Sequence, residues 1–75
     1  MHKVIGDISK SKTTKTMISL TEFKGNKLIN IREYFKNNTM AEWQPTKKGV
    51  MISTDKASEL VTIFEQVEDA IKKGV

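Results

Sequence analysis

Aromatic rings and basic side chains alternate through the middle of the chain. The rings belong to Phe23, Tyr34, Phe35 and Trp43, and the cations among them to Lys24, Lys27, Arg32, Lys36, Lys47 and Lys48. Proteins hold single-stranded nucleic acid with this combination, because cations follow the phosphates while flat rings stack on unpaired bases for about 1–3 kcal/mol per base. The pattern favours such binding, although rings packed in a core and lysines on an ordinary solvated surface would give the same composition.

Residues that catalyse reactions are poorly represented. The chain has no cysteine and a single histidine, His2, close to the N-terminus. A cysteine or histidine metal cluster and a serine with a histidine base are therefore excluded, and no glycine-rich phosphate loop occurs. The sequence predicts a binding protein that is not an enzyme and that uses neither a metal nor a cofactor.

Charge is distributed unevenly along the chain. Residues 1–52 contain ten Lys and Arg against four Asp and Glu, a net charge of +6, whereas residues 53–75 contain three against five, a net charge of −2. This asymmetry indicates an anionic partner on one face of the protein. No apolar run approaches the roughly 20 residues that cross a bilayer, so no membrane partner is expected.

The small size of the chain predicts a second copy. A domain of 75 residues buries a modest part of its surface, and such domains rely on a disulfide, a metal or oligomerisation for stability. Because the composition excludes the first two, we expect a homodimer.

Two segments rich in β-forming residues, 16–23 and 27–36, predict a hairpin. Gly25-Asn26 between them suits a two-residue type II′ turn, in which Lys24 would pair with Lys27. That register gives an aliphatic face, expected in the core, which comprises Ile18, Leu20, Glu22, Ile29, Ile31, Glu33 and Phe35. The opposite mixed face, expected as a wet binding surface, comprises Met17, Ser19, Thr21, Phe23, Leu28, Asn30, Arg32 and Tyr34.

The segments around the hairpin complete the expected fold. Residues 4–8 form a short strand, residues 9–16 a basic arm or loop, residues 46–49 a basic loop and residues 50–52 a strand, while Pro45 favours a sheet edge. Helical spacing of apolar residues beyond Ser53, with Phe64 in the core, predicts a long helix packed across the sheet. Its wide apolar stripe fits either a single buried face or a face that also contacts a partner. The expected class is α+β: a curved four-stranded antiparallel sheet followed by one C-terminal helix, assembled as a homodimer.

Three elements of the sequence carry a family resemblance. They are Phe23-Lys24-Gly25, the run from Leu28 to Phe35, and Pro45-x-Lys47-Lys48-Gly49 ahead of a short strand and a helix. In order and spacing, over about residues 16–73, they resemble the positive cofactor four family of transcriptional coactivators. The chain departs from the family pattern at Asn26, Phe35, Gln44 and Thr46, where lysine, tryptophan, lysine and glycine would be expected.

The resemblance implies a domain that dimerises through its helices and binds unpaired or melted DNA in channels on its sheets. Residues 16–75 would form this single-stranded-DNA-binding domain, and residues 1–15 a basic N-terminal arm or short strand. The candidate site comprises Phe23, Lys24, Lys27, Arg32, Phe35, Lys47, Lys48 and Gly49, with Tyr34, Trp43 and Lys15 as additional candidates. Phe35 carries two conflicting expectations, because the hairpin register places it with the aliphatic residues whereas the resemblance makes it a DNA contact.

We therefore expect a homodimeric protein that binds single-stranded DNA without sequence specificity in transcription, replication or recombination. Transcription or replication proteins are the candidate protein partners. Two alternatives are a protein-interaction module that recruits such machinery and an RNA-binding module, because nothing in the residues selects for or against a 2′-hydroxyl. The expected location is intracellular: the nucleus in a eukaryote, or the cytoplasm, nucleoid or infected host cell for a bacterial or viral protein.

Overall fold

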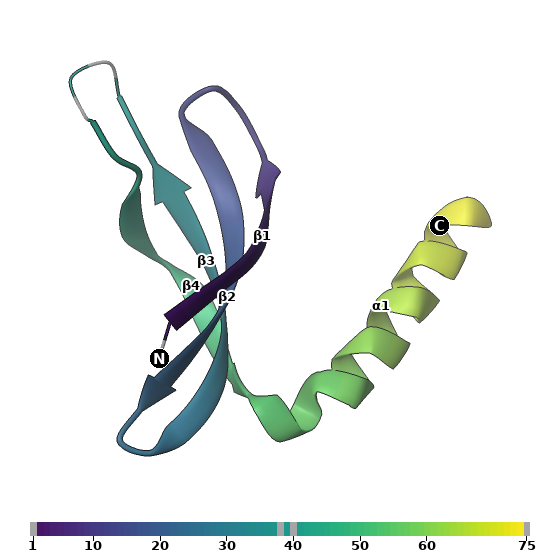
Figure 1. Ribbon diagram of the computed structural model, residues 1–75. Helices are drawn as coiled ribbons and strands as arrows, with labels where there is room; N and C mark the ends of the chain where they lie inside the picture. Colours follow the sequence, from purple (N-terminus) through teal and green to yellow (C-terminus); the bar gives the residue numbers. More distant parts are fainter. Residues whose placement is uncertain (1, 38, 40, 75) are drawn as a thin grey trace.

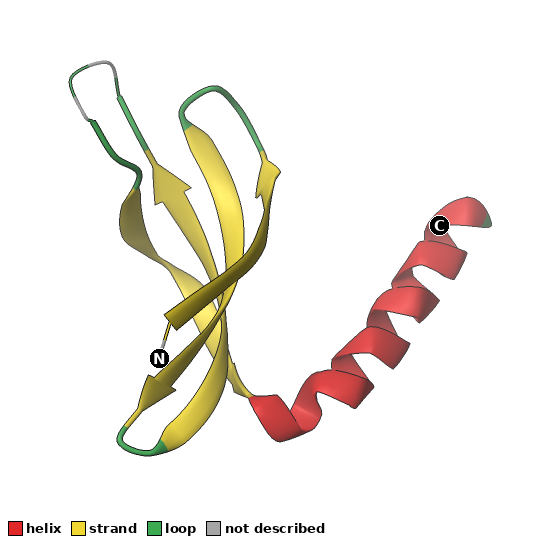
Figure 2. Cartoon of the chain, viewed as in Figure 1, coloured by secondary structure: helices red, strands yellow, loops and turns green. Residues whose placement is uncertain are grey.

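The computed structural model describes residues 2–37, 39 and 41–74. Four antiparallel strands lie side by side in the order β1-β2-β3-β4 and are followed by a short 3-10 turn and a helix (Figures 1 and 2). The elements are β1 (His2–Ser9), β2 (Thr14–Phe23), β3 (Asn26–Phe35), β4 (Gln44–Ser53), η1 (Thr54–Lys56) and α1 (Ala57–Lys72). The predicted four-stranded antiparallel sheet with one C-terminal helix is confirmed.

The turn of the β2–β3 hairpin differs from the expected one. Phe23 pairs with Asn26, so the turn consists of Lys24 and Gly25, whose φ angles are 51° and 82°. Two successive positive φ angles are characteristic of a type I′ turn, and the prediction of a type II′ turn at Gly25-Asn26 is wrong.

Pairing between opposite charges explains the observed register. Glu22 lies opposite Lys27, whereas the expected register would set Lys24 against Lys27, and like charges directly opposite each other are destabilising. Ile18 also gains an apolar partner in Ile31. Because the two registers differ by two residues and side chains alternate with a period of two, every side chain of the hairpin keeps the face that the sequence predicted.

The outer strands are longer than the sequence indicated, and both are irregular. β2 begins at Thr14, so the predicted arm or loop over residues 9–16 is reduced to a connection at residues 10–13, and β1 shifts register between Val4 and Gly6. β4 includes residues 46–49, which were expected to form a loop. These residues bulge out of the β3–β4 ladder between the pairs Arg32–Gly49 and Tyr34–Pro45, and the composition of a bulge resembles that of a loop.

The helix α1 leaves the sheet instead of packing across it (Figure 1). None of its residues is buried, and Phe64, which the sequence placed in the core, is 59% exposed. The expectation that the helix covers its own sheet is therefore wrong for the single chain. The chain passes from β4 through η1 into α1 without turning back over the strands (Figure 1).

No apolar residue is buried within the described ranges. The most buried residues are polar: Ser19 and Asn30, 1% and 8% exposed, which pair across β2 and β3 on the mixed face. Large exposed apolar side chains occur on the strands and on the helix, among them Ile5, Ile8, Val50, Val61, Phe64 and Ile71. The chain thus leaves its large apolar side chains uncovered. No described helix has the length and apolar character of a membrane span.

The turn geometry predicts that Gly25→Ala destabilises the protein by about 1 kcal/mol, because a side chain at a φ of 82° is strained. Urea unfolding measures the change. Gly6→Ala is the matched control, because Gly6 has no positive φ and an added Cβ would meet nothing within 4 Å. Equal destabilisation by the two substitutions would contradict the assignment of the turn.

Candidate nucleic-acid interface

Arg32 lies near the middle of the mixed face, and neighbouring groups fix its guanidinium. Nε donates a hydrogen bond to Asn30 Oδ1 at 3.3 Å, and Nη1 donates one to the backbone carbonyl of Thr46 at 2.9 Å. The residue is half-buried. Because a guanidinium has five N–H groups in a planar fork, it can make both of these bonds and still donate to an anionic ligand.

Gly49 lies opposite Arg32 on β4, where a side chain would not fit. A Cβ at this position would be 2.8 Å from the Ile31 carbonyl oxygen and 2.9 Å from Arg32 Cζ. Gly49 therefore makes room for the Arg32 side chain, a role that needs no contact with a ligand.

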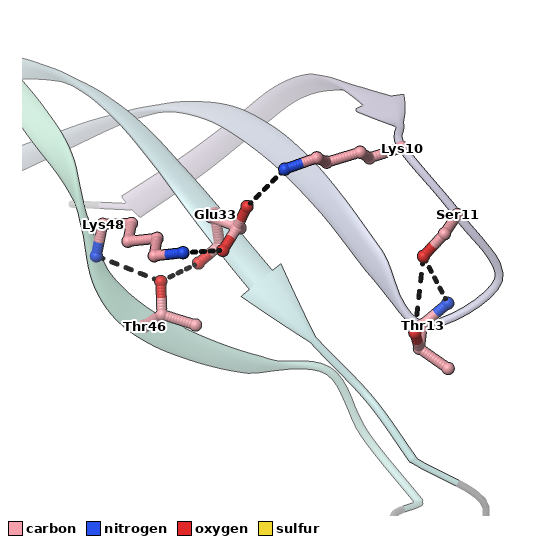
Figure 3. Close-up of polar contacts among 6 residues, drawn as sticks. All are labelled: Lys10, Ser11, Thr13, Glu33, Thr46 and Lys48. Carbon is pink, nitrogen blue, oxygen red and sulfur yellow. Dashed lines mark hydrogen bonds and ion pairs between the residues drawn. The ribbon is translucent and has the colours of Figure 1, made fainter.

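The bulge of β4 carries the basic pair Lys47-Lys48. Thr46 Oγ1 donates a hydrogen bond to the Glu33 carbonyl at 2.9 Å and accepts one from the Lys48 backbone N–H at 3.1 Å (Figure 3). The Glu33 carboxylate, on the aliphatic face, lies 3.8 Å from Lys48 Nζ and 3.5 Å from Lys10 Nζ. Both lysines are exposed to solvent, and the contact with Glu33 places the Lys48 ammonium toward the aliphatic face.

The turn end of the hairpin carries an exposed ring beside a cation. Phe23 is 61% exposed and shares the mixed face with Arg32, about 20 Å away along the strands. Lys24 Nζ lies 5.3 Å from the centroid of the Phe23 ring, within the range of a cation–π contact. Lys27, opposite Glu22, lies on the aliphatic face instead.

The end of the sheet away from this turn holds the three additional candidates. Lys15 Nζ lies 4.6 Å from the centroid of the Trp43 ring and 3.2 Å from the Asp7 carboxylate, and the Lys15 side chain is only 15% exposed. Lys36 Nζ lies 6.0 Å from the same ring. Tyr34 pairs with Lys15 across β2 and β3 and is half-buried. Lys15 therefore already has an anionic and an aromatic partner within the protein.

Phe35 remains on the aliphatic face. The β2–β3 pairing is regular through to its last pair, Thr14 with Phe35, so nothing in this ladder turns the ring toward Arg32. A register shift could have placed Phe35 on the mixed face, as the family resemblance implies. The shift that does occur lies in the β3–β4 ladder, where the extra residues belong to β4.

The predicted site residues therefore divide between the two sides of the sheet. Arg32, Phe23 and Tyr34 share the mixed face, with Lys24 beside Phe23 and Gly49 beside Arg32. Lys27, Phe35 and Lys48 lie on or toward the aliphatic face.

Sequence reasoning did not assign roles to the two residues that hold Arg32. Asn30 has a sequence signal, because it stands two residues before Arg32 and must share its face of the strand. Thr46 has none, because its contact with Arg32 depends on the bulge that carries it back over β3.

The sheet and the trailing helix form a small α+β domain whose fold is shared with solved structures. The structure of a bacteriophage T5 homolog of the eukaryotic transcription coactivator PC4, implicated in recombination-dependent DNA replication, superposes with a TM-score of 0.76 at 23% identity, covering 95% of this chain and 81% of that one. The crystal structure of a MoSub1–DNA complex superposes with a TM-score of 0.64 at 22% identity, covering 93% and 86%. At these identities the likeness is one of fold.

A family model described as Transcriptional Coactivator p15 (PC4) matches residues 10–63, and the chain belongs to this family. It is 34% identical over 59 residues to the RNA polymerase II transcriptional coactivator KELP of Arabidopsis thaliana. The matched region covers 79% of this chain and 34% of that protein. The chain thus spans about a third or less of the length of the curated relatives that it matches.

The close approach at Gly49 predicts that Gly49→Ala destabilises the protein by about 1–3 kcal/mol, because the added Cβ meets a backbone carbonyl that cannot swing aside. Urea unfolding, compared with Gly6→Ala, measures this cost. A Gly49→Ala protein as stable as the Gly6→Ala protein would contradict the packing described for Arg32.

Proposed function

We propose that this chain is a single-stranded-DNA-binding protein of the transcriptional-coactivator type, which works as a homodimer and binds through the mixed face of its sheet. The observation that carries the proposal is Arg32, a half-buried guanidinium held from two sides on the same face as the exposed ring of Phe23. Membership of the coactivator family supports it, as does the DNA bound to the structural neighbour MoSub1.

The proposed chemistry assigns phosphates to the cations and bases to the rings. Arg32 offers a planar fork that suits a phosphate, and Lys24 adds a second cation beside Phe23. An unpaired base stacks on Phe23, which requires the base to be out of a duplex. Neither a phosphate contact nor stacking identifies a base, so the binding is non-specific in sequence.

Residues on the aliphatic side of the sheet can contact DNA only where the strand passes over an edge of the mixed face. β4 is an edge strand, so DNA that crosses this edge passes the exposed Lys47 and then Lys48. Lys27 and Phe35 contribute only to a strand that continues around an edge of the sheet. Melted DNA of this kind occurs inside the cell in transcription, replication and recombination alike.

The uncovered apolar surface supports a homodimer through the helices. Val61, Phe64, Val67 and Ile71 are each between 46% and 65% exposed, and each fully buried side chain of this kind stabilises by about 1.5–3 kcal/mol. A second copy presents the same surface, so pairing two helices and the adjoining sheets covers both at once. We expect the core of the protein to form between protomers.

We expect the dimer to bind a fluorescent oligonucleotide of about 20 thymidylates more tightly than a matched duplex at moderate salt. A single-stranded RNA of equal length forms a third arm. Preference for RNA would favour an RNA-binding module, and failure to bind any of the three would favour a protein-interaction module.

In the same assay, Lys47→Ala with Lys48→Ala weakens binding and lowers the steepness of the log–log salt dependence by about 1.4, because each phosphate contact on a single strand contributes about 0.7. Lys72→Ala with Lys73→Ala removes the same charge from the far end of α1, where both lysines pair with acidic neighbours, and leaves the slope unchanged. An unaltered slope in the first variant would remove this lysine pair from the site.

Sedimentation at micromolar concentration is expected to give a dimer. Phe64→Glu places a charge in the proposed interface and yields monomer or unfolded chain, whereas Gln66→Glu adds the same charge to another side of the helix and leaves the dimer intact. A wild-type monomer that is folded at this concentration would overturn the assembly.

A further inference from the structure

The hydroxyl of Thr46 occupies the bulge of β4. Between Arg32 and Tyr34 a single residue of β3, Glu33, faces residues 46–48 of β4, so the regular ladder is interrupted there. Thr46 Oγ1 bridges the interruption by donating to the Glu33 carbonyl and accepting from the Lys48 N–H (Figure 3). One side chain thus replaces ladder hydrogen bonds that the bulge removes.

The backbone of the same residue holds Arg32. The Thr46 carbonyl accepts the hydrogen bond from Arg32 Nη1, and Asn30, which is nearly buried, accepts the one from Nε. These two acceptors belong to different strands, so the direction of the guanidinium depends on where the bulge sits against β3. The hydroxyl of Thr46 ties the bulge to Glu33 on β3.

We propose that Thr46 is a positioning residue for phosphate binding: its hydroxyl fixes the β4 bulge so that its carbonyl, together with Asn30, orients Arg32 toward the DNA backbone. The inference rests on the proposed single-strand binding and identifies a residue that acts through Arg32. A guanidinium oriented in advance loses less side-chain freedom on binding, which strengthens binding without adding charge.

A purely structural role for the hydroxyl makes a different prediction. In that case its loss would disturb the sheet and weaken binding to the same degree whether or not Arg32 is present. If Thr46 acts through Arg32, its loss has no further effect once Arg32 is removed. A double-mutant cycle separates the two roles.

The experiment measures binding of the same thymidylate oligonucleotide by Thr46→Val, Arg32→Ala and the double variant. Thr46→Val is expected to weaken binding about fivefold in the wild-type background, within the range known for coupled neighbours, and to change it less than about 1.5-fold in the Arg32→Ala background. The salt dependence falls by about 0.7 for Arg32→Ala, the value for one phosphate contact, and stays unchanged for Thr46→Val, which keeps the charge of Arg32.

Two variants serve as controls. Thr46→Ser keeps the hydroxyl and is expected to bind as the wild type does. Thr62→Val removes a hydroxyl that donates to the Ser58 carbonyl within α1, away from the sheet, and is also expected to bind normally. If Thr46→Val does not fold, the serine variant still tests the inference, because strong loss of binding by it would overturn the role of the hydroxyl.

The outcomes separate this inference from the proposed function. If the wild-type protein does not bind the oligonucleotide, both the proposed function and the positioning role of Thr46 are wrong. If the wild-type protein binds and Thr46→Val is equally harmful in both backgrounds, the positioning role alone is overturned. If Arg32→Ala has no effect, Arg32 is also removed from the proposed site.

Discussion

The position of the helix away from its own sheet governs how much apolar surface the molecule exposes. α1 follows η1 away from the strands, and the apolar residues of both elements remain uncovered. The two sides of the sheet therefore present different surfaces. The aliphatic side and the helix are left for apolar contacts, and the mixed side is left for water and polar ligands.

The bulge in β4 connects the sheet to the chemistry of its surface. A regular ladder would have continued the pairing of β3 and β4 past Arg32 without placing a carbonyl over its guanidinium. The bulge does so, and Gly49 leaves the space in which the arginine can lie. Local irregularity in a strand thus gives Arg32 a second hydrogen-bond acceptor besides Asn30 on its own strand.

Much of this organisation could be predicted from the sequence, for reasons that particular residues make clear. The faces of the hairpin follow from the period of two in side-chain direction. They were therefore predicted correctly even though the error in the turn shifted the partner of every residue by two. The turn itself was mispredicted because Lys24, unlike Asn or Gly, gives no sign that it will adopt a positive φ. The bulge, the contact of Thr46 and the departure of the helix depend on relations between distant segments, which local patterns do not encode.

The irregular outer strands have a consequence for how such sheets can associate. β1 shifts register between Val4 and Gly6, and β4 carries both its bulge and Pro45, which has no N–H to donate. Neither border of the sheet is a straight template for another strand, and such interruptions discourage growth by strand addition into fibres. In the proposed dimer, copies of the chain would meet through their faces and helices, while open-ended stacking is suppressed at the sheet borders.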